Sequence, residues 1–150
     1  MTQTAWAPLS NAKHIDWVLA SIKAHPEKWA AARDAVWNAA YDAAYDAAWD
    51  AAWDAARKAG RDAARDAAYD AACDAVWYEA WDAAIDAAWN AAWGTIVALI
   101  AYDDCAYMIE SEVGELKIIA AFGDPRAILL LPACIAFNEI KVLTKASIAV

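Results

Sequence analysis

Residues 41–56 read YDAAYDAAWDAAWDAA, and this four-residue unit decides the fold. The unit has the form X-Asp-Ala-Ala, and within the zone 26–94 it keeps its phase from Trp29 to Trp93. Alanine is the best helix former, and no proline lies between Pro26 and Gly94. The period and the high Asp and Ala content exclude strands. We therefore predict an all-α helical bundle in which a long alanine-rich repeat hairpin packs on C-terminal aliphatic helices.

A repeat of four residues cannot stay on one face of an α-helix, because the helix has about 3.6 residues per turn. Each unit moves the X position around the helix by ~40°, so that X returns to the same face after about nine units. Aromatic residues at X should therefore point in every direction, with some rings facing solvent in a monomer. We expect the protein to self-associate through these rings. The candidate interface residues are Tyr41, Tyr45, Trp49, Trp77, Trp81 and Trp89.

One continuous helix through the repeat would be ~100 Å long, which is too long for the remaining helices of one chain to cover. The repeat could stay long and be covered by other subunits, or it could break into a hairpin of two helices. The hairpin is favoured, because Gly60 is the only glycine inside the repeat and lies near its middle. Pairs of alanines would then let the two helices approach closely.

The chain is predicted to be a single helical domain, 1–150, with three zones. Zone 1–25 holds a helix that Ser10 or Asn11 could cap and that should run to about Ala24. Zone 26–94 holds the repeat helices, and zone 95–150 holds the core helices. Within the last zone we expect helices at 95–109, 112–121 and 124–140, while the tail 141–150 could be strand-like or frayed. The expected main core is the aliphatic cluster of Leu129, Leu130, Leu131, Ile135 and Phe137.

A basic block interrupts the otherwise acidic repeat. The only charged residues three or four positions from Arg61 are cations, so Arg61 needs a carboxylate or another anion from elsewhere. The block could be a solvated face or pair with another helix. Alternatively, it could bind a small anionic, nucleotide-like ligand, with bases stacked on rings and phosphate held by guanidinium groups. The residues of this candidate ligand site are Arg57, Arg61, Arg65, Trp53 and Tyr69.

One carboxylate is predicted to be buried. Asp104 falls in the apolar stripe of the helix expected at 95–109, and a buried carboxylate needs a partner. Arg126 and Arg61 are the candidate partners.

Composition argues against several classes of function. The formal net charge of -9 disfavours binding to duplex nucleic acid and to anionic membranes, and it suits a basic partner protein. The apolar runs are too short for a membrane helix, and we see no signal peptide, so we expect a cytoplasmic protein. Three widely spaced cysteines indicate free thiols. No glycine-rich phosphate loop, metal pattern or catalytic motif occurs, so we expect neither a cofactor nor an enzyme.

The segments YDAAYDAAWDAAWDAA, ALIAYDDCAY and GDPRAILLLPACIAF resemble alanine-rich tetrad-repeat proteins of unknown function from bacteria and tailed phages. The resemblance covers roughly residues 29–138. It implies no activity and no site residues, although a phage setting would favour a role in host–virus conflict. Together, these observations predict a non-enzymatic interaction protein that self-associates and binds a partner protein, with sequestration of a small anionic ligand as the alternative.

Overall fold

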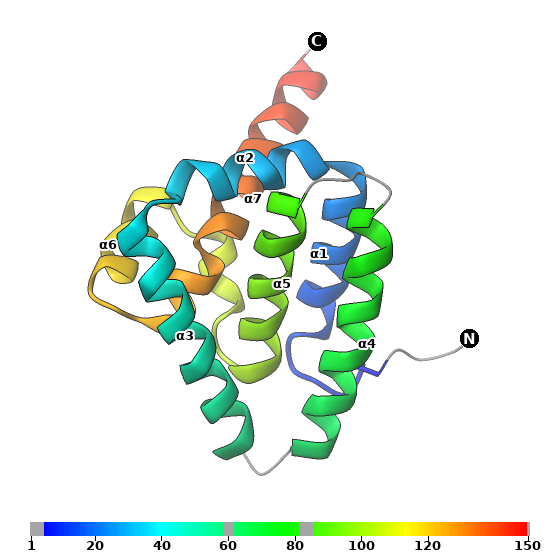
Figure 1. Cartoon of the computed structure of the whole chain (residues 1–150). Coiled ribbons are helices and arrows are strands. Elements are labelled where there is room, and N and C mark those ends of the chain that lie inside the picture. Colours follow the sequence, from blue (N-terminus) through cyan, green and yellow to red (C-terminus); the bar gives the residue numbers. More distant parts are fainter. Residues whose placement is uncertain (1–4, 59–61, 82–85, 150) are drawn as a thin grey trace.

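The computed structural model describes the backbone of residues 5–58, 62–81 and 86–149, and the side chains of 5–38, 40–55, 66–75 and 87–141. All regular structure in these ranges is helical, which confirms the predicted all-α bundle (Figure 1). The helices are α1 (Ala12–Ala24), α2 (Pro26–Val36), α3 (Ala39–Lys58), α4 (Asp62–Trp81), α5 (Asp86–Ala101), the 3-10 helix η1 (Ala106–Glu110), α6 (Val113–Ala121) and α7 (Pro125–Ala149).

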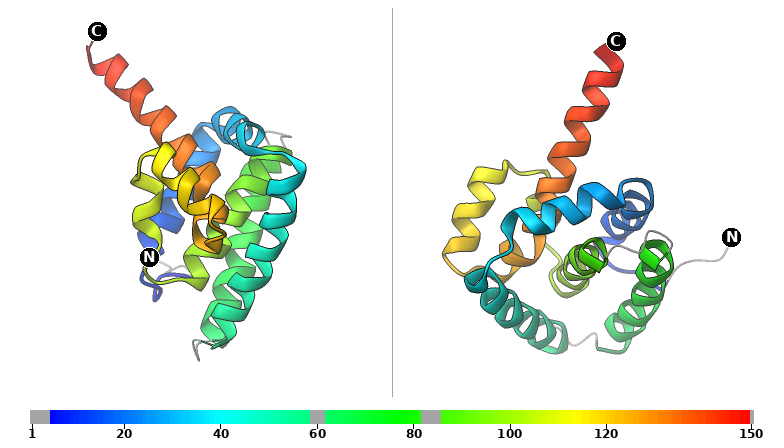
Figure 2. Two further views of the ribbon diagram at one scale, coloured as in Figure 1. Left: turned by 90° about the vertical axis from the view of Figure 1, so that its left-hand side faces the viewer. Right: turned by 45° about the horizontal axis from the view of Figure 1, so that its top comes forward.

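Helix α5 is the centre of the bundle. Residues 91–101 are all buried, because α1, α2, α3, α4 and α7 surround this helix (Figures 1 and 2). A helix that is apolar on all sides is stable only in such a position. Helix α7 adds the predicted aliphatic core: Leu129, Leu130 and Leu131 are buried, while Ile135 and Phe137 are partly buried against it.

The tetrad repeat is divided among four helices rather than two. A break follows α2, where Trp37 has an extended backbone and the Asn38 side chain accepts a hydrogen bond from the Tyr41 N–H at 2.8 Å. Asn38 thus caps the start of α3. The break expected near Gly60 falls at residues 59–61, which lie outside the described residues. Helices α3 and α4 on either side of them run antiparallel, as a hairpin requires (Figure 1).

The two arms of the hairpin do not pack closely on each other, contrary to our expectation. Each packs more extensively on α5 (Figure 1). The small side chains that let α3 and α4 pack close to α5 belong to fully buried alanines: Ala52 on α3, Ala68 and Ala72 on α4, and Ala88 and Ala92 on α5.

The expected boundary at residue 94 does not separate two helices. Helix α5 begins within the repeat and continues through Gly94, so the helix predicted at 95–109 is wrong. The reason is that the tetrad spacing of Trp89 and Trp93 continues with the buried residues Val97 and Ala101. The apolar pattern therefore passes through the glycine without interruption.

The N-terminal helix ends at Ala24 as predicted, but Asn11 does not cap it. The Asn11 Nδ2 instead donates to the carbonyl oxygens of Leu99, at 2.9 Å, and Tyr102, at 2.6 Å. These carbonyls belong to the C-terminal end of α5, where no intrahelical donor remains. Asn11 therefore joins the start of the chain to the end of the central helix.

Asp104 is not buried, contrary to the prediction, because α5 ends before reaching it. Its predicted partner is correct: Arg126 Nη1 lies 3.3 Å from Asp104 Oδ1. The side chain of Asp104 is 79% exposed, so this ion pair contributes little to stability.

The C-terminal tail is helical rather than strand-like. Helix α7 continues to Ala149, and its last turns project away from the body of the bundle (Figures 1 and 2).

Candidate functional site

The aromatic residues of α3 contact a different neighbour at each step of the repeat. Tyr41 faces α7, where its hydroxyl donates to the Ile128 carbonyl oxygen at 2.7 Å. Tyr45 faces α5, where its hydroxyl donates to the Asn90 carbonyl oxygen at 3.2 Å. That hydroxyl occupies the space that a Cβ on Gly94 would need.

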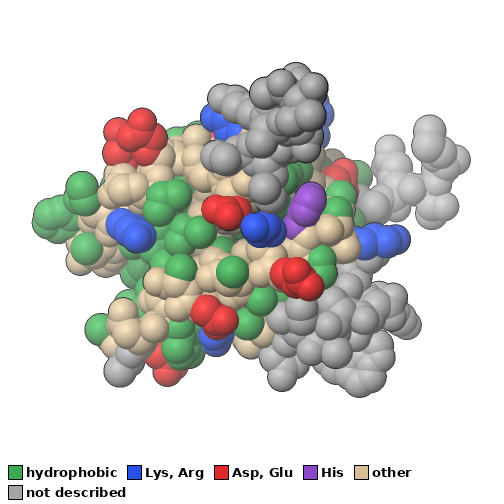
Figure 3. All heavy atoms as spheres, turned by 90° about the horizontal axis from the view of Figure 1, so that it is seen from above, with side chains coloured by type: hydrophobic (Ala, Val, Ile, Leu, Met, Phe, Trp, Pro, Cys, Tyr) green, Lys and Arg blue, Asp and Glu red, His purple; other side chains and the backbone are tan. Residues whose placement is uncertain are grey.

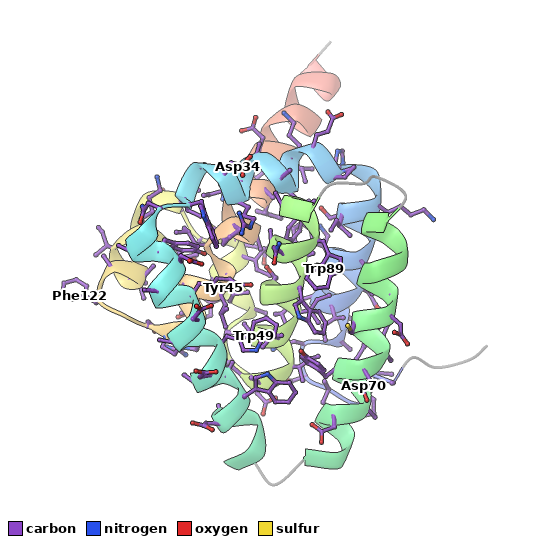
Figure 4. The ribbon with its side chains drawn as sticks, in the orientation of Figure 1. Asp34, Tyr45, Trp49, Asp70, Trp89 and Phe122 are labelled. Carbon is purple, nitrogen blue, oxygen red and sulfur yellow. The ribbon has the colours of Figure 1, made fainter. Side chains whose placement is uncertain are left out.

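The next two aromatic residues of α3 continue the series. Trp49 packs on Trp93 of α5, with ring centroids 5.9 Å apart. Trp53 packs on Tyr69 of α4, with centroids 4.5 Å apart. The drift of ~40° per tetrad therefore turns successive rings from α7, across α5, to α4. Figure 4 shows Tyr45, Trp49 and Trp89 directed into the bundle.

This arrangement corrects the expected aromatic interface. Tyr41, Tyr45, Trp49 and Trp89 are partly buried and pack against the core of their own chain. They do not form an exposed face. The rings point in different directions around α3, and three neighbouring helices, α7, α5 and α4, cover them. The two other candidates, Trp77 and Trp81, have side chains outside the described residues.

The rings of the candidate ligand site leave no room for a base between them. Trp53 and Tyr69 contact each other directly, and the hollow beside them has a volume of about 10 Å³, roughly enough for one water molecule. Asp66 also lines this hollow, and its carboxylate would repel an anion. Arg57, Arg61 and Arg65 have side chains outside the described residues, so their part in an anion site stays a prediction.

A larger groove lies between α6 and the junction of α2 with α3. Its volume is about 480 Å³, within the range of ligand and peptide pockets. The lining is mostly small or apolar, with one amide and one ammonium group. It comprises Ala35, Val36, Asn38, Ala40, Tyr41, Ala44, Lys117, Ala120, Ala121, Ile128 and Leu131.

Exposed apolar side chains lie on α6 and at the α2–α3 junction, although none of them lines the groove. Phe122 is 89% exposed and Ile118 is 60% exposed, one helical turn apart at the end of α6. Ile119 on the same helix and Trp37 at the α2–α3 junction are also exposed. In Figure 4 Phe122 points away from the bundle, and Figure 3 shows hydrophobic side chains at the left-hand edge, where Figure 1 places α6.

One cation, Lys117, belongs to the lining of the groove. At the α2–α3 junction the Arg33 guanidinium lies 3.6 Å from the centroid of the Trp37 ring. A cation over an indole face is an attractive contact, so Arg33 helps to hold Trp37 in place. The outer faces of α3 and α4, in contrast, carry exposed aspartates at every fourth residue, such as Asp46 and Asp70.

Sequence reasoning missed this groove, although α6 carried a signal. Residues 118–122 read IIAAF. A helix that buries only one side needs apolar residues on that side alone, and this segment is apolar at every position. Only Leu116 of this helix is buried. The groove itself depends on how α6 lies against α3, which the repeat pattern does not contain.

The cysteines are poor nucleophiles in this structure. Burial raises the pKa of Cys105 to about 12 and that of Cys134 to about 11. It also raises the pKa of Cys73. A thiol reacts as its thiolate, which is scarce at neutral pH when the pKa is this high. Among the side chains that the structure describes, no three His, Cys, Asp or Glu residues come together as a possible metal site.

None of the helices in the described part of the chain is both long enough and apolar enough to cross a membrane. The sequence matches no protein-family model, and the comparisons with curated proteins and with solved structures gave no match.

Proposed function

We propose that this protein is a non-enzymatic helical interaction protein that self-associates through α6, using the exposed apolar side chains of this helix and the groove beside it. The observation that carries the proposal is the exposure of Phe122 and Ile118 on α6, whose residues Lys117, Ala120 and Ala121 line the groove. Contiguous exposed apolar surface of this kind marks an interaction site. Binding a helix in an apolar groove is a recurring mode of protein recognition.

The way α6 packs on the rest of the bundle supports an interface at this helix. Helix α6 packs on α7, whereas its contacts with α3 are few enough to leave the groove open. Covering Ile118, Ile119 and Phe122 would remove apolar area from water at roughly 25 cal/mol per Å².

The distribution of charge favours the same surface. Two copies with a formal net charge of -9 repel each other, and the rows of exposed aspartates make the outer faces of α3 and α4 the least favourable places for contact. Lys117 lies in the lining of the groove and reduces this repulsion locally.

Sedimentation velocity over a range of concentrations tests the proposal. We expect the wild-type chain to shift toward a dimer in the micromolar range, and the double variant Ile118→Ser/Phe122→Ser to shift only at concentrations at least ~10-fold higher. The matched control is Tyr107→Ser, which removes an exposed aromatic ring (59% exposed) that lies on η1 and not on α6. A wild-type chain that stays monomeric, or equal weakening by the control, would overturn the proposal.

A further inference from the structure

The groove between α6 and the α2–α3 junction has an apolar buried lining. Val36, Ile128 and Leu131 belong to this lining and are at most 8% exposed. The Tyr41 hydroxyl donates to the Ile128 carbonyl oxygen at 2.7 Å, so this part of the lining is held between α3 and α7. With a volume of about 480 Å³, the groove has room for the apolar body of a small molecule.

The polar side chains of the lining offer hydrogen-bond donors. Lys117 contributes an ammonium group from α6, and Asn38 contributes an amide from the α2–α3 junction. The Asn38 Oδ1 already accepts a hydrogen bond from the Tyr41 N–H at 2.8 Å, which leaves the Nδ2 group, a donor. An ammonium group is also a donor only. A ligand that pairs with these groups must therefore supply acceptors.

The charge of the lining differs from that of the chain. The sequence has 21 acidic and 12 basic residues, yet the described residues that line the groove include Lys117 and no carboxylate. Glu115 lies two residues before Lys117 on α6 and therefore faces a different side of the helix. The groove thus combines an apolar lining with one positive charge, and this combination favours an anionic amphiphile.

We propose that this groove binds a free, single-chain carboxylate. Its alkyl chain lies against Val36, Ile128 and Leu131, and its carboxylate pairs with Lys117. Burial of the alkyl chain supplies affinity, and the charge-assisted hydrogen bond supplies the preference for an anion. The site differs from the arginine and aromatic site predicted from the sequence, where the hollow beside Trp53 and Tyr69 holds about 10 Å³.

The bound carboxylate should compete with self-association. Lys117, Ala120 and Ala121 of α6 line the groove, whereas Ile118 and Phe122 do not. A carboxylate therefore leaves these two side chains exposed, but it occupies the space that a second copy uses in the proposed function. The site itself belongs to one chain and does not require a dimer.

Three probes that share one alkyl chain test the class of ligand: octanoate, 1-octanol and octylammonium. In isothermal titration calorimetry, below the aggregation limit of each probe, we expect octanoate to bind at least ~10-fold more tightly than the other two. Lys117→Gln should weaken octanoate binding to the level of octanol. The matched control Lys13→Gln, at an exposed position on α1 outside the groove lining, should keep the preference.

Filling the groove tests the position of the site. Ala121→Phe places a ring at an exposed lining position of α6, so we expect the fold to persist and octanoate binding to weaken at least ~10-fold. Ala67→Phe, at an exposed position on α4 outside the lining, should bind octanoate as the wild type does. Circular dichroism and the unfolding midpoint verify that both variants are folded.

The outcomes separate this inference from the proposed function. Equal affinity for octanoate and octanol, or undiminished octanoate binding in Ala121→Phe, would overturn the carboxylate site. A chain that stays monomeric in sedimentation velocity but binds octanoate with the expected preference would support the site and overturn self-association. A dimer that dissociates with octanoate would support both. A dimer that persists at saturating octanoate would mean that the second copy does not enter the groove, and the carboxylate site would stand.

Discussion

The hydroxyl of Tyr45 occupies the position that a side chain on Gly94 would fill. It donates to the Asn90 carbonyl oxygen at 3.2 Å, one turn earlier on the same buried helix. A glycine within a helix lowers stability by ~1 kcal/mol relative to alanine. Here, however, the missing side chain lets an aromatic ring of α3 pack directly on the surface of α5. This contact sets the position of α3 along the axis of α5.

Replacement of this glycine should therefore destabilise the protein. In Gly94→Ala the new Cβ would overlap the Tyr45 hydroxyl and approach its Cζ to 2.9 Å, so we expect a loss of ~1–3 kcal/mol in urea unfolding. Gly114→Ala on α6, where a Cβ meets nothing within 4 Å, should instead stabilise by up to ~1 kcal/mol. Adding Tyr45→Phe should restore part of the loss, and strictly additive effects would contradict this explanation.

The fully buried alanines of the repeat should tolerate no larger side chain. Ala72 on α4 is 0% exposed and faces the bundle, so Ala72→Leu should destabilise the chain by ~1–3 kcal/mol through overpacking. Ala67→Leu on the exposed side of the same helix should change stability by less than ~0.5 kcal/mol. Thermal unfolding followed by circular dichroism distinguishes the two, and equal effects would mean that α4 does not present this face to α5.

The link between the N-terminal segment and α5 should contribute measurably to stability. Asn11→Ala leaves the buried Leu99 carbonyl oxygen without its side-chain donor, which should cost ~1–3 kcal/mol in urea unfolding. Ser10→Ala removes an exposed hydrogen bond to Asp103 and should cost less. If both variants unfold at the same urea concentration, Asn11 does not have this role.

Stability should fall at alkaline pH because of the buried phenols. Burial raises the pKa of Tyr41 and Tyr45 above the ordinary value, and that of Tyr69 to about 12. A raised folded-state pKa means that the unfolded chain releases its protons first, so the contribution is complete below pH ~10 and declines as the pH rises above it. Urea midpoints between pH 8 and 11.5 measure the decline, which Tyr41→Phe/Tyr45→Phe should reduce. An equal decline in this variant would assign the effect to other groups.

The sequence predicted the helices well and their boundaries less well. Alanine content and the tetrad period were sufficient for the all-α bundle, and the aliphatic run at 129–131 was sufficient for the core. The break at Trp37 and Asn38 was missed because the repeat keeps its phase across it. An asparagine that can cap a helix was the available signal.

The candidate site could not be predicted to the same extent. The drift of ~40° per tetrad led us to expect rings pointing in every direction, and we assigned the exposed ones to contacts with other subunits. The chain supplies them itself, since α7, α5 and α4 receive Tyr41, Tyr45 and Trp53 in turn. The groove arises from the placement of α6 beside α3, and local sequence patterns do not encode such a distant pairing.

Hydrogen–deuterium exchange of the full chain at low and high protein concentration tests the groove interface most directly. We expect exchange to slow with concentration in α6, while α4, which does not line the groove, exchanges at the same rate at both concentrations. Slowing confined to α4, or no dependence on concentration in α6, would contradict self-association through α6 and its groove.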